Sequence, residues 1–378
     1  MIEVREVITK RDKKKFVNYP LQLYKDCPYY VPYLTIDEMN TLNPKKNSYL
    51  LDNEFKAFLA YKDGKLVGRI AGIVSTKDNE LTGEKKIRFS RFECIDDIEV
   101  FKALLGAVAK FGKECGMEVM HGPWGFNDTD REGLLTYGFD RRSTYATNYS
   151  YPYFAEKLEQ LGFEDGSKWI ERDFVIPTEP YERFVRISDK LKTRMKLVDI
   201  ADTMSVKQII ANYGDEFFET MTDAYGHLDG YVPIVGKARQ EMLDQFASIV
   251  NTRYISFLID EKGKVAGFGI CFPSICDAVI KSKAKMLPFG WARLLKAINS
   301  PKELEMALIG VRKEYKNSGI NSIIITRIMK NILEDGIEKI ESNPMLEHNL
   351  NVQQQWKFVG GGIIKKRQTY VKKIDEML

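Results

Sequence analysis

The chain has 378 residues, which exceeds the usual size of one domain and predicts two. Hydrophobic residues make up 44% of it and charged residues 29%, a balance typical of folded globular proteins that excludes a disordered or collagen-like chain. The formal net charge of +4 is too small to indicate a protein that binds nucleic acid.

The beginning of the chain, MIEVREVITKRDKKKF, contains no apolar stretch of the kind found in signal peptides. No window reaches the roughly 18 uncharged apolar residues that a membrane-spanning helix requires. The five cysteines and three histidines are scattered and do not show the spacing of a zinc site. We therefore expect a cytoplasmic protein with reduced cysteines and without a bound metal.

Two segments have the pattern of a β-hairpin. Residues 55–75 and 254–272 each contain an apolar run, a polar turn that ends in Gly-Lys, and a second apolar run. Downstream, residues 98–115 and 320–334 carry apolar side chains at helical spacing, and a glycine follows each segment where a helix would end. Each half of the chain therefore begins with a predicted hairpin and continues to a long amphipathic helix.

A short apolar segment and a closing segment follow each predicted helix. The short segments read MEVMHGPW and IEKIESNP, and each closing segment combines a helical pattern, a glycine and a final strand. The spacing supports two copies of one plan, because 98 residues separate Gly64 from Gly162 and 97 separate Gly263 from Gly360. The alternative is that a mixed α/β chain produces such pairs by chance. We predict a first domain, a linker and a second domain at residues 1–176, 177–193 and 194–378.

The second half contains two local motifs. Residues 307–330, ALIGVRKEYKNSGINSIIITRIMK, read as a strand, a loop and a helix, and the loop Lys316-Asn-Ser-Gly319-Ile-Asn321 is similar to Arg/Gln-x-x-Gly-x-Gly/Ala. Further on, Asn349-x-x-Val352-x-x-x-Trp356-x-x-x-Gly360 is similar to Asn-x-x-Ala-x-x-x-Tyr-x-x-x-Gly. Both patterns are those of the GNAT superfamily of acyl-CoA N-acyltransferases, which the order of elements in both halves also resembles.

This resemblance implies an α/β (α+β) protein with two tandem GNAT-like domains, each a mixed, mostly antiparallel central sheet flanked by helices. It also implies acetyl-CoA or another acyl-CoA as cosubstrate, and no metal. Gly319 would let the backbone approach a pyrophosphate, and the N–H groups at the start of the next helix would bind the phosphate oxygens. Lys316, Arg312 and Lys313 would add positive charge. The implied cofactor-binding residues are Ile309, Gly310, Val311, Lys316, Asn317, Ser318, Gly319, Ile320, Asn321 and Asn349.

The residues that would carry out the chemistry are less clear from the motifs. Trp356 stands where many family members have a tyrosine that protonates the departing thiolate, so we consider Tyr370 on the closing strand as its substitute. Glu305 on the central strand is the first candidate for the general base, because a carboxylate that faces an apolar cleft has a raised pKa. His348 and Glu341 are further candidates. The alternatives are a packed aromatic, a salt-bridged glutamate and an ordinary loop histidine.

The first half lacks the phosphate-binding motif. Asp96, Asp97 and Glu99 occupy the position where phosphates would lie, and like charges there would repel them. We therefore predict that this half does not bind CoA. Its inserted loop at residues 121–140, HGPWGFNDTDREGLLTYGFD, is expected either to help shape a substrate pocket or only to pack against its domain.

An inserted segment in the second half combines basic and large apolar residues. Residues 281–298 read KSKAKMLPFGWARLLKAI. A segment of this composition is able to contact an anionic membrane or to cover an acyl chain, and a helix packed on the sheet explains it equally well. The sequence leaves the choice among these interpretations open.

Together these features predict an N-acyltransferase, similar to acetyltransferases, that moves an acyl group from acyl-CoA to a primary amine of a small molecule, peptide or lipid. Two other functions agree with the sequence. One is a non-catalytic binding protein with the same fold, which the loss of the tyrosine favours. The other is a long-chain N-acyltransferase that acts on a lipid amine, which the basic apolar insertion favours.

Overall fold

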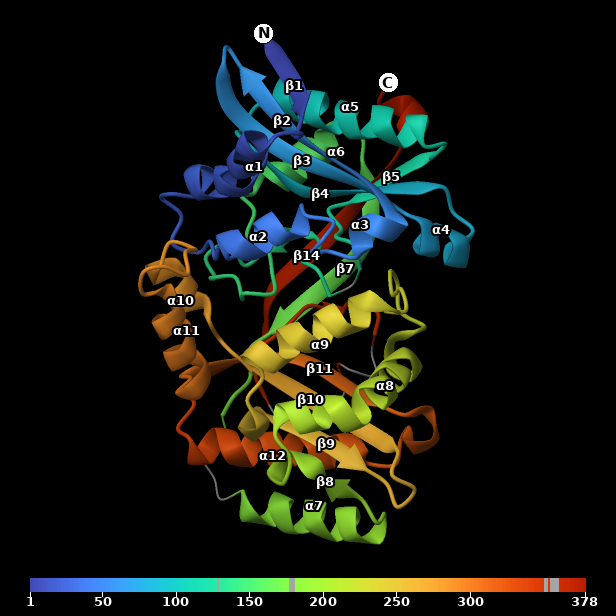
Figure 1. The fold of residues 1–378 in the computed structure, drawn as a ribbon, viewed down its shortest axis with the longest axis vertical. Helices are drawn as coiled ribbons and strands as arrows, with labels where there is room; N and C mark the ends of the chain where they lie inside the picture. Colours follow the sequence, from blue (N-terminus) through green and yellow to red (C-terminus); the bar gives the residue numbers. More distant parts are fainter. Residues whose placement is uncertain (128, 177–180, 350–352, 354–359) are drawn as a thin grey trace.

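The computed structural model describes residues 1–127, 129–176, 181–349, 353 and 360–378. Two lobes lie end to end along the long axis of the molecule, and both ends of the chain lie at the outer end of the first lobe (Figure 1). No helix in these ranges is both long enough and apolar enough to cross a membrane.

The first half of the chain forms a sheet with helices on its faces. Its elements are β1 (Ile2–Glu6), α1 (Lys10–Leu23), α2 (Thr35–Thr41), α3 (Tyr49–Asp52), β2 (Asn53–Lys62), β3 (Lys65–Ser75), α4 (Thr76–Thr82), β4 (Lys86–Cys94), α5 (Ile98–Glu114), β5 (Val119–Gly122), β6 (Leu134–Tyr137), α6 (Tyr153–Gln160) and β7 (Glu164–Arg172). The hairpin predicted at residues 55–75 and the helix predicted at 98–115 are confirmed as β2–β3 and α5.

The second half repeats this order. Its elements are α7 (Glu182–Arg194), β8 (Val198–Asp199), α8 (Val206–Tyr225), α9 (Lys237–Ile249), β9 (Ile255–Ile259), β10 (Val265–Pro273), α10 (Cys276–Lys281), α11 (Gly290–Asn299), β11 (Glu303–Val311), α12 (Ile320–Glu334), β12 (Lys339–Ser342), β13 (Met345–Leu346) and β14 (Ile363–Lys373). The hairpin predicted at 254–272 is β9–β10, and the helix predicted at 320–334 is α12.

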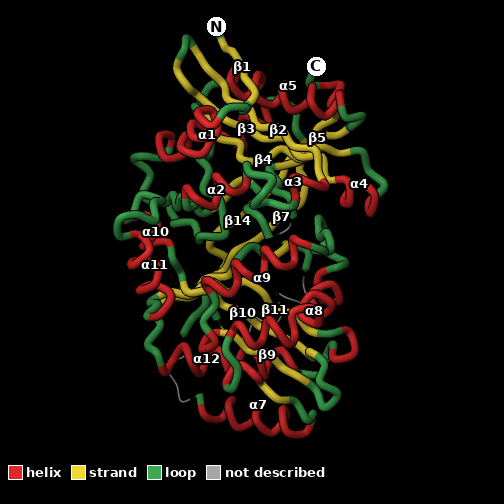
Figure 2. The backbone as a smooth tube through the Cα atoms, in the orientation of Figure 1, coloured by secondary structure: helices red, strands yellow, loops and turns green. Residues whose placement is uncertain are grey.

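The described strands form two sheets, which Figure 2 shows in yellow in the two lobes. The first has the order β1-β2-β3-β4-β5-β14-β7-β13, with β6 also paired to β14, and the second has the order β12-β11-β10-β9-β8. All pairs are antiparallel except β4–β5 and β11–β12, which are parallel. The prediction of mixed, mostly antiparallel sheets flanked by helices is therefore confirmed.

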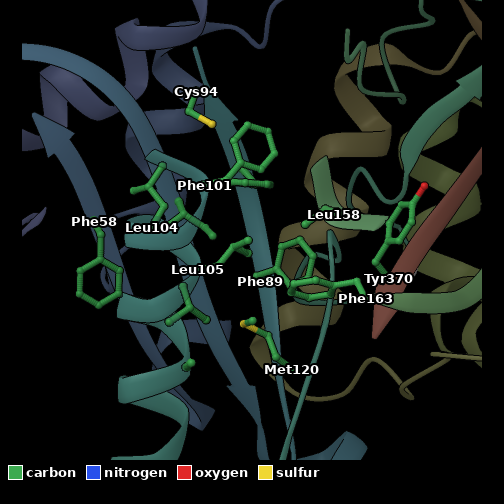
Figure 3. Packing of buried hydrophobic residues seen from close by; sticks show 14 of the residues in the cluster. Phe58, Phe89, Cys94, Phe101, Leu104, Leu105, Met120, Leu158, Phe163 and Tyr370 are labelled. Atoms are coloured by element: carbon green, nitrogen blue, oxygen red, sulfur yellow. The ribbon is translucent and has the colours of Figure 1, made fainter. Parts of the chain in front are cut away.

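The core of the first lobe forms where α5 packs on the sheet. Buried side chains recur along one face of the helix, among them Phe101, Leu104 and Leu105, and they contact buried residues of β3 and β4. Figure 3 shows this cluster, with Tyr370 of β14 beside Phe163 and Leu158. A strand from the end of the chain thus contributes to the core of the first lobe.

In the second lobe the sheet is covered on both faces. Because neighbouring residues of a strand point to opposite faces, Leu258 packs in one cluster with α12, and Phe257 and Ile259 pack in another with α8. Helix α7 packs on the outer side of α12. Much of the segment that the sequence assigns to a linker at 177–193 is therefore helix α7 in contact with the second lobe, while residues 177–180 lie outside the described ranges.

The last strand of the chain does not join the sheet of its own half. The sequence predicts residues 363–373 as the closing strand of the second half, but β14 lies between β5 and β7 of the first sheet. This part of the prediction is wrong. An alternating strand pattern indicates a strand but not its partner, and the partner here lies about 200 residues earlier, for example Trp169 opposite Arg367.

Buried ion pairs hold β14 in this position. Lys365 Nζ lies 2.8 Å from Glu171 Oε2 on β7 and 3.2 Å from Glu341 Oε2 on β12, and Arg367 Nε donates to the other oxygen of Glu171. Lys365 and Glu171 are completely buried. Burial would raise the pKa of Glu171, but Arg367 and Lys365 outweigh it and lower the pKa, so the carboxylate stays ionised.

Replacing the shared carboxylate tests the importance of this cluster. Glu171→Ala leaves two buried cations without their main partner and should lower the free energy of unfolding by about 3–5 kcal/mol. The control is Glu347→Ala. It removes the exposed partner of Lys366, which also lies on β14, and should lower the free energy of unfolding by less than about 1 kcal/mol. Urea unfolding of both variants measures the difference, and equal costs would contradict a central role for the buried pairs.

Candidate functional site

The loop that leads into α12 leaves the start of the helix without a cap. Gly319 is the N-cap residue, with φ at +92°, and no described side chain accepts a hydrogen bond from the first turn of α12 in the manner of a cap. A Cβ on Gly319 would also lie 3.1 Å from a methyl group of Leu191, so both the backbone angle and the space favour glycine. The first N–H groups of α12 can therefore bind an anion.

One amide of the predicted anion site is already occupied. The N–H of Ser318 donates to the carbonyl oxygen of Tyr315 at 3.2 Å, and the hydroxyl of Ser318 donates to the same oxygen at 2.6 Å. Ser318 is one of the implied cofactor-binding residues, and its place in that set is corrected, because its N–H belongs to a turn that shapes the loop. The candidate anion site begins at Gly319, where the chain enters the helix.

Charge near this loop comes from lysines. Lys316 and Lys313 are exposed, but Arg312 is only 9% exposed and its guanidinium donates to Glu216 on α8. The expectation that Arg312 adds positive charge for a phosphate is therefore wrong, because an ion pair inside the lobe neutralises it. Lys316, within this turn, is the cation best placed to attract an anion to the start of α12.

The equivalent helix of the first lobe is capped by its own carboxylate. Asp97 is the N-cap residue of α5 and accepts a hydrogen bond from the N–H of Glu99 at 3.0 Å. Lys62 Nζ lies 2.5 Å from the other carboxylate oxygen of Asp97, and Lys157 pairs with Asp96. A carboxylate thus lies where α12 has an open helix start, which supports the prediction that the first half does not bind CoA.

A cavity of about 230 Å³ lies where β11 and β12 separate. The two strands pair only as far as Met306 and Ser342, and from there β11 continues to Val311 paired with β10 but not with β12. The resemblance to the GNAT superfamily implies such a separation of the central strand from its neighbour, and the strand pairing agrees with it. Most of the wall is apolar and includes Ile324 and Ile328 from α12. Helix α12 thus has one face on the cavity and an uncapped start at the loop that follows β11.

The first lobe closes one side of this cavity. Thr129, Asp130 and Glu132 of the predicted loop 121–140 line it, as does Trp169 of β7. Glu132 is 7% exposed, and Asp130 accepts the N–H of Phe126 at 3.4 Å and faces Arg91. The sequence leaves open whether this loop shapes a pocket or only packs against its domain. Its position on the cavity wall agrees with the first interpretation.

Tyr225, at the end of α8, lies at the open edge of β11. Its hydroxyl donates to the carbonyl oxygen of Ile309 at 2.9 Å and accepts the N–H of Ile309 at 3.0 Å. Both residues line the cavity. Because the family resemblance implies that the pantetheine arm pairs with this strand, Tyr225 occupies hydrogen-bonding groups that such a ligand would use. Gly310 faces β10 instead, where an added Cβ would lie 2.6 Å from the ring of Phe268.

Glu305 is buried against the first lobe and does not line the cavity between β11 and β12. It accepts the N–H of Tyr145 at 3.1 Å, the hydroxyl of Ser274 at 3.1 Å and the thiol of Cys276 at 3.4 Å. Burial raises the pKa of Glu305 more than these donors lower it. The raised pKa agrees with the expectation from sequence, but the carboxyl group lies between the lobes, where it connects β11 to the loop between β6 and α6.

The other two predicted catalytic residues also lie away from the cavity wall. Tyr370 is completely buried in the core of the first lobe, and its hydroxyl has no hydrogen-bond partner among the described residues, which matches the packed-aromatic alternative. His348 is exposed in a turn. Glu341, the further candidate, is buried and pairs with Lys339 and Lys365. None of these side chains reaches the wall of the cavity.

Asn349 does line the cavity, in agreement with its predicted place near the cofactor. Val352 and Trp356 of its motif lie outside the described residues, whereas Gly360 is described and has φ at +76°. Tyr225 and Glu132 are the cavity residues that sequence reasoning missed. Neither belongs to a motif, and only the position of Glu132 in the inserted loop 121–140 could have drawn attention to it.

The architecture has clear counterparts among solved structures. A tandem GNAT protein from the clavulanic acid biosynthesis pathway matches with a TM-score of 0.57 and 10% identity over 99% of both chains. The chain has the tandem GNAT fold. A GCN5-related N-acetyltransferase from Sphaerobacter thermophilus matches with a TM-score of 0.53 and 8% identity over 99% of this chain and 96% of that one.

Two curated proteins are similar in sequence over nearly their whole length. Protein YghO of Escherichia coli K12 is 27% identical over 98% of this chain and 95% of its own, and the bacterial ceramide synthase of Caulobacter vibrioides is 24% identical over 98% and 97%. No protein-family model matches the chain. The tandem GNAT chain thus has relatives of nearly the same length, one of which is named a ceramide synthase.

The burial of Glu305 predicts a pH-dependent stability difference. Because its pKa in the folded protein is raised above 4.5, the folded state holds this proton more tightly than the unfolded chain. Its contribution to the free energy of unfolding is therefore present at low pH and is lost as the pH rises through the raised pKa. Glu305→Gln cannot ionise, so its stability relative to the wild type should improve from acid to neutral pH.

Urea unfolding of the wild type and Glu305→Gln at a series of pH values measures this difference. Comparing the two proteins at each pH removes the contributions of all other titrating groups. A difference that stays constant over the whole range would contradict a carboxyl group that is buried and protonated more readily in the folded protein.

Proposed function

We propose that the protein is an acyl-CoA-dependent N-acyltransferase. The observation that supports it most is the combination of an uncapped start of α12 with an apolar cavity along the same helix. In the proposal, Lys316 and the N–H groups from Gly319 to Asn321 hold the pyrophosphate, and Ile309 and Asn349 contact the pantetheine arm. The resemblance to the GNAT loop supports the same assignment.

In this proposal the amine enters from the side that the first lobe closes. The amine must lose a proton as its nitrogen attacks the thioester carbonyl. Glu132 is our candidate for the base, because it is a buried carboxylate that the inserted loop of the first lobe places on the cavity wall. When the C–S bond breaks, the thiolate must gain a proton, and the hydroxyl of Tyr225 is the candidate donor on the second-lobe wall.

A long-chain acyl group and a lipid amine are the substrates we favour. The cavity is lined mainly by aliphatic and aromatic side chains, such as Ile270, Phe272 and Leu308, which suit a hydrocarbon chain better than a polar acceptor. The relative from Caulobacter vibrioides is named a ceramide synthase, and ceramides are N-acylated lipid amines. These two observations favour the lipid version of the proposal over acetyl transfer to a small polar amine.

Charge reversal at the loop tests the cofactor site. Lys316→Glu should raise the Kd for CoA by roughly tenfold or more, because a favourable charge near the phosphates becomes a repulsive one. The control, Lys330→Glu, makes the same change in net charge in the C-terminal half of the same helix and should leave the Kd unchanged. Isothermal titration calorimetry with CoA measures both, and equal effects of the two variants would place the phosphates elsewhere.

Removal of the carboxylate on the first-lobe wall tests the chemistry. Glu132→Gln should lower kcat by about 10²–10⁴-fold and leave the Kd for CoA unchanged, since a general base contributes about that much. The control is Asp229→Asn, an exposed carboxylate on the same cavity, which should keep its activity. Release of the free thiol from long-chain acyl-CoA with long-chain amines as acceptors measures turnover. Binding of CoA by the wild type without turnover on any amine would favour the non-catalytic alternative.

A further inference from the structure

The inserted segment 281–298 presents an unusual cluster of exposed apolar side chains. Leu287 is 75% exposed, Phe289 67%, Trp291 49% and Leu295 50%. No other stretch of nine residues in the described chain contains more than two large hydrophobic residues as exposed as these. Exposed apolar residues that gather in one place mark interaction surfaces, whereas single ones are ordinary.

The exposed side chains are held on an ordered support. The N–H of Ala284 donates to Val279 O at 2.9 Å, and the N–H of Trp291 donates to Met286 O at 2.9 Å. On the inner side, Ala284 and Leu294 are buried in a cluster with Leu34 of the first lobe. The inward-facing residues are therefore already packed, and the outward-facing ones are displayed on a firm base.

The loop that carries the most exposed residues also doubles back tightly. A Cβ on Gly290 would lie 1.9 Å from the carbonyl oxygen of Lys285, so only glycine fits at this position. The indole N–H of Trp291 donates to Pro288 O at 3.1 Å, which fixes the ring at the start of α11. Trp291 and Leu295 are one helical turn apart and therefore share one side of α11.

The charged side chains within this segment are all positive. Between residues 281 and 298 the sequence contains five basic residues and no acidic one. Lys283, Lys285, Arg293 and Lys296 are exposed, and in the described part of the chain none of these four forms an ion pair. Lys281 alone pairs, with Asp277 at 3.1 Å. A partner surface must therefore accept large apolar side chains in its centre and supply negative charge around them.

We propose that residues 281–298 form a docking surface for an anionic lipid membrane. Leu287, Phe289, Trp291 and Leu295 enter the interfacial region, and the basic side chains lie against anionic headgroups. Charge argues against a second copy of the chain as the partner, because two copies would place their four unpaired cations against each other. The inference goes beyond the proposed acyl transfer and does not depend on it.

The position of the segment suits this role. In Figure 1 α10 and α11 lie along one side of the molecule, at the level where the two lobes meet. The segment is tied to the first lobe, where the N–H of Thr35 donates to Ala284 O at 2.9 Å and Arg142 Nη1 lies 2.5 Å from Asp277. A membrane bound here would therefore contact a rigid surface that both lobes support.

Co-sedimentation with lipid vesicles tests the proposal on the full chain. The wild type should bind vesicles of mixed phosphatidylglycerol and phosphatidylcholine, bind phosphatidylcholine vesicles several-fold more weakly, and lose affinity as salt is added. The double variant Leu287→Ser/Phe289→Ser should bind the mixed vesicles at least about tenfold more weakly, because two large side chains no longer enter the lipid. Lys283→Gln/Lys285→Gln should reduce both the binding and its salt dependence.

The matched control replaces Leu51 of α3 and Leu81 of α4, whose exposure is similar to that of Leu287 and Phe289. Both helices lie away from α10 and α11 in Figure 1. Leu51→Ser/Leu81→Ser should bind vesicles as the wild type does, and circular dichroism should show that every variant is folded. Lys316→Glu should also bind vesicles normally, which separates this proposal from that of the CoA site.

Three results would overturn the proposal. The first is no binding of the wild type to phosphatidylglycerol vesicles at low salt. The second is an equal loss in Leu287→Ser/Phe289→Ser and in the control pair. The third combines two observations: the wild type does not bind vesicles, and replacing Leu287 and Phe289 changes a dimer to a monomer in analytical ultracentrifugation. That result would assign the surface to a second copy of the chain.

Discussion

Lys365 and Arg367, two buried cations of β14, share the carboxylate of Glu171 on β7, and the arrangement of the two lobes depends on this contact. A buried charge without a partner costs several kcal/mol, on the order of 3–5 when a pair is broken. A shift of β14 by one residue would turn both cations to the opposite face of the sheet. The ion pairs therefore select one register and one partner for the last strand of the chain.

Because β14 lies within the first sheet, residues of both lobes form the candidate site. Beyond β7 the chain continues along the second sheet. There the N–H of Phe174 donates to Ile340 O at 3.1 Å, and the backbone of Asp173 forms an isolated antiparallel β-bridge with that of Glu341. Strand β14 returns in the opposite direction to the first sheet. The two crossings bring Trp169 and Glu132 against a cavity whose other walls are β11 and α12. A boundary near residue 176 thus divides the sequence but does not divide the sheets.

The elements that could be predicted from the sequence are those whose conformation is determined by residues close together in the chain. The hairpin at Gly64, the hairpin at Gly263 and the uncapped turn at Gly319 are set by residues next to one another, and the structure has all three. The partner of β14 could not be predicted, because it depends on contacts with residues far away in the chain. The same reason explains the positions of Tyr370 and Glu305, whose surroundings are supplied by the other lobe.

The two lobes differ most in how their main helices begin. The carboxylate of Asp97 caps α5, whereas α12 starts at a bare Gly319. A capping carboxylate and a bound phosphate compete for the same N–H groups, so a lobe can have one or the other. A cap stabilises a helix by about 1 kcal/mol, which α12 gives up. Its buried face, with Ile320, Ile324 and Ile328 in the core, offsets that loss through packing. Helix α12 can thus keep an open start because its stability comes from elsewhere, and this physical difference supports placing the proposed anion site in the second lobe.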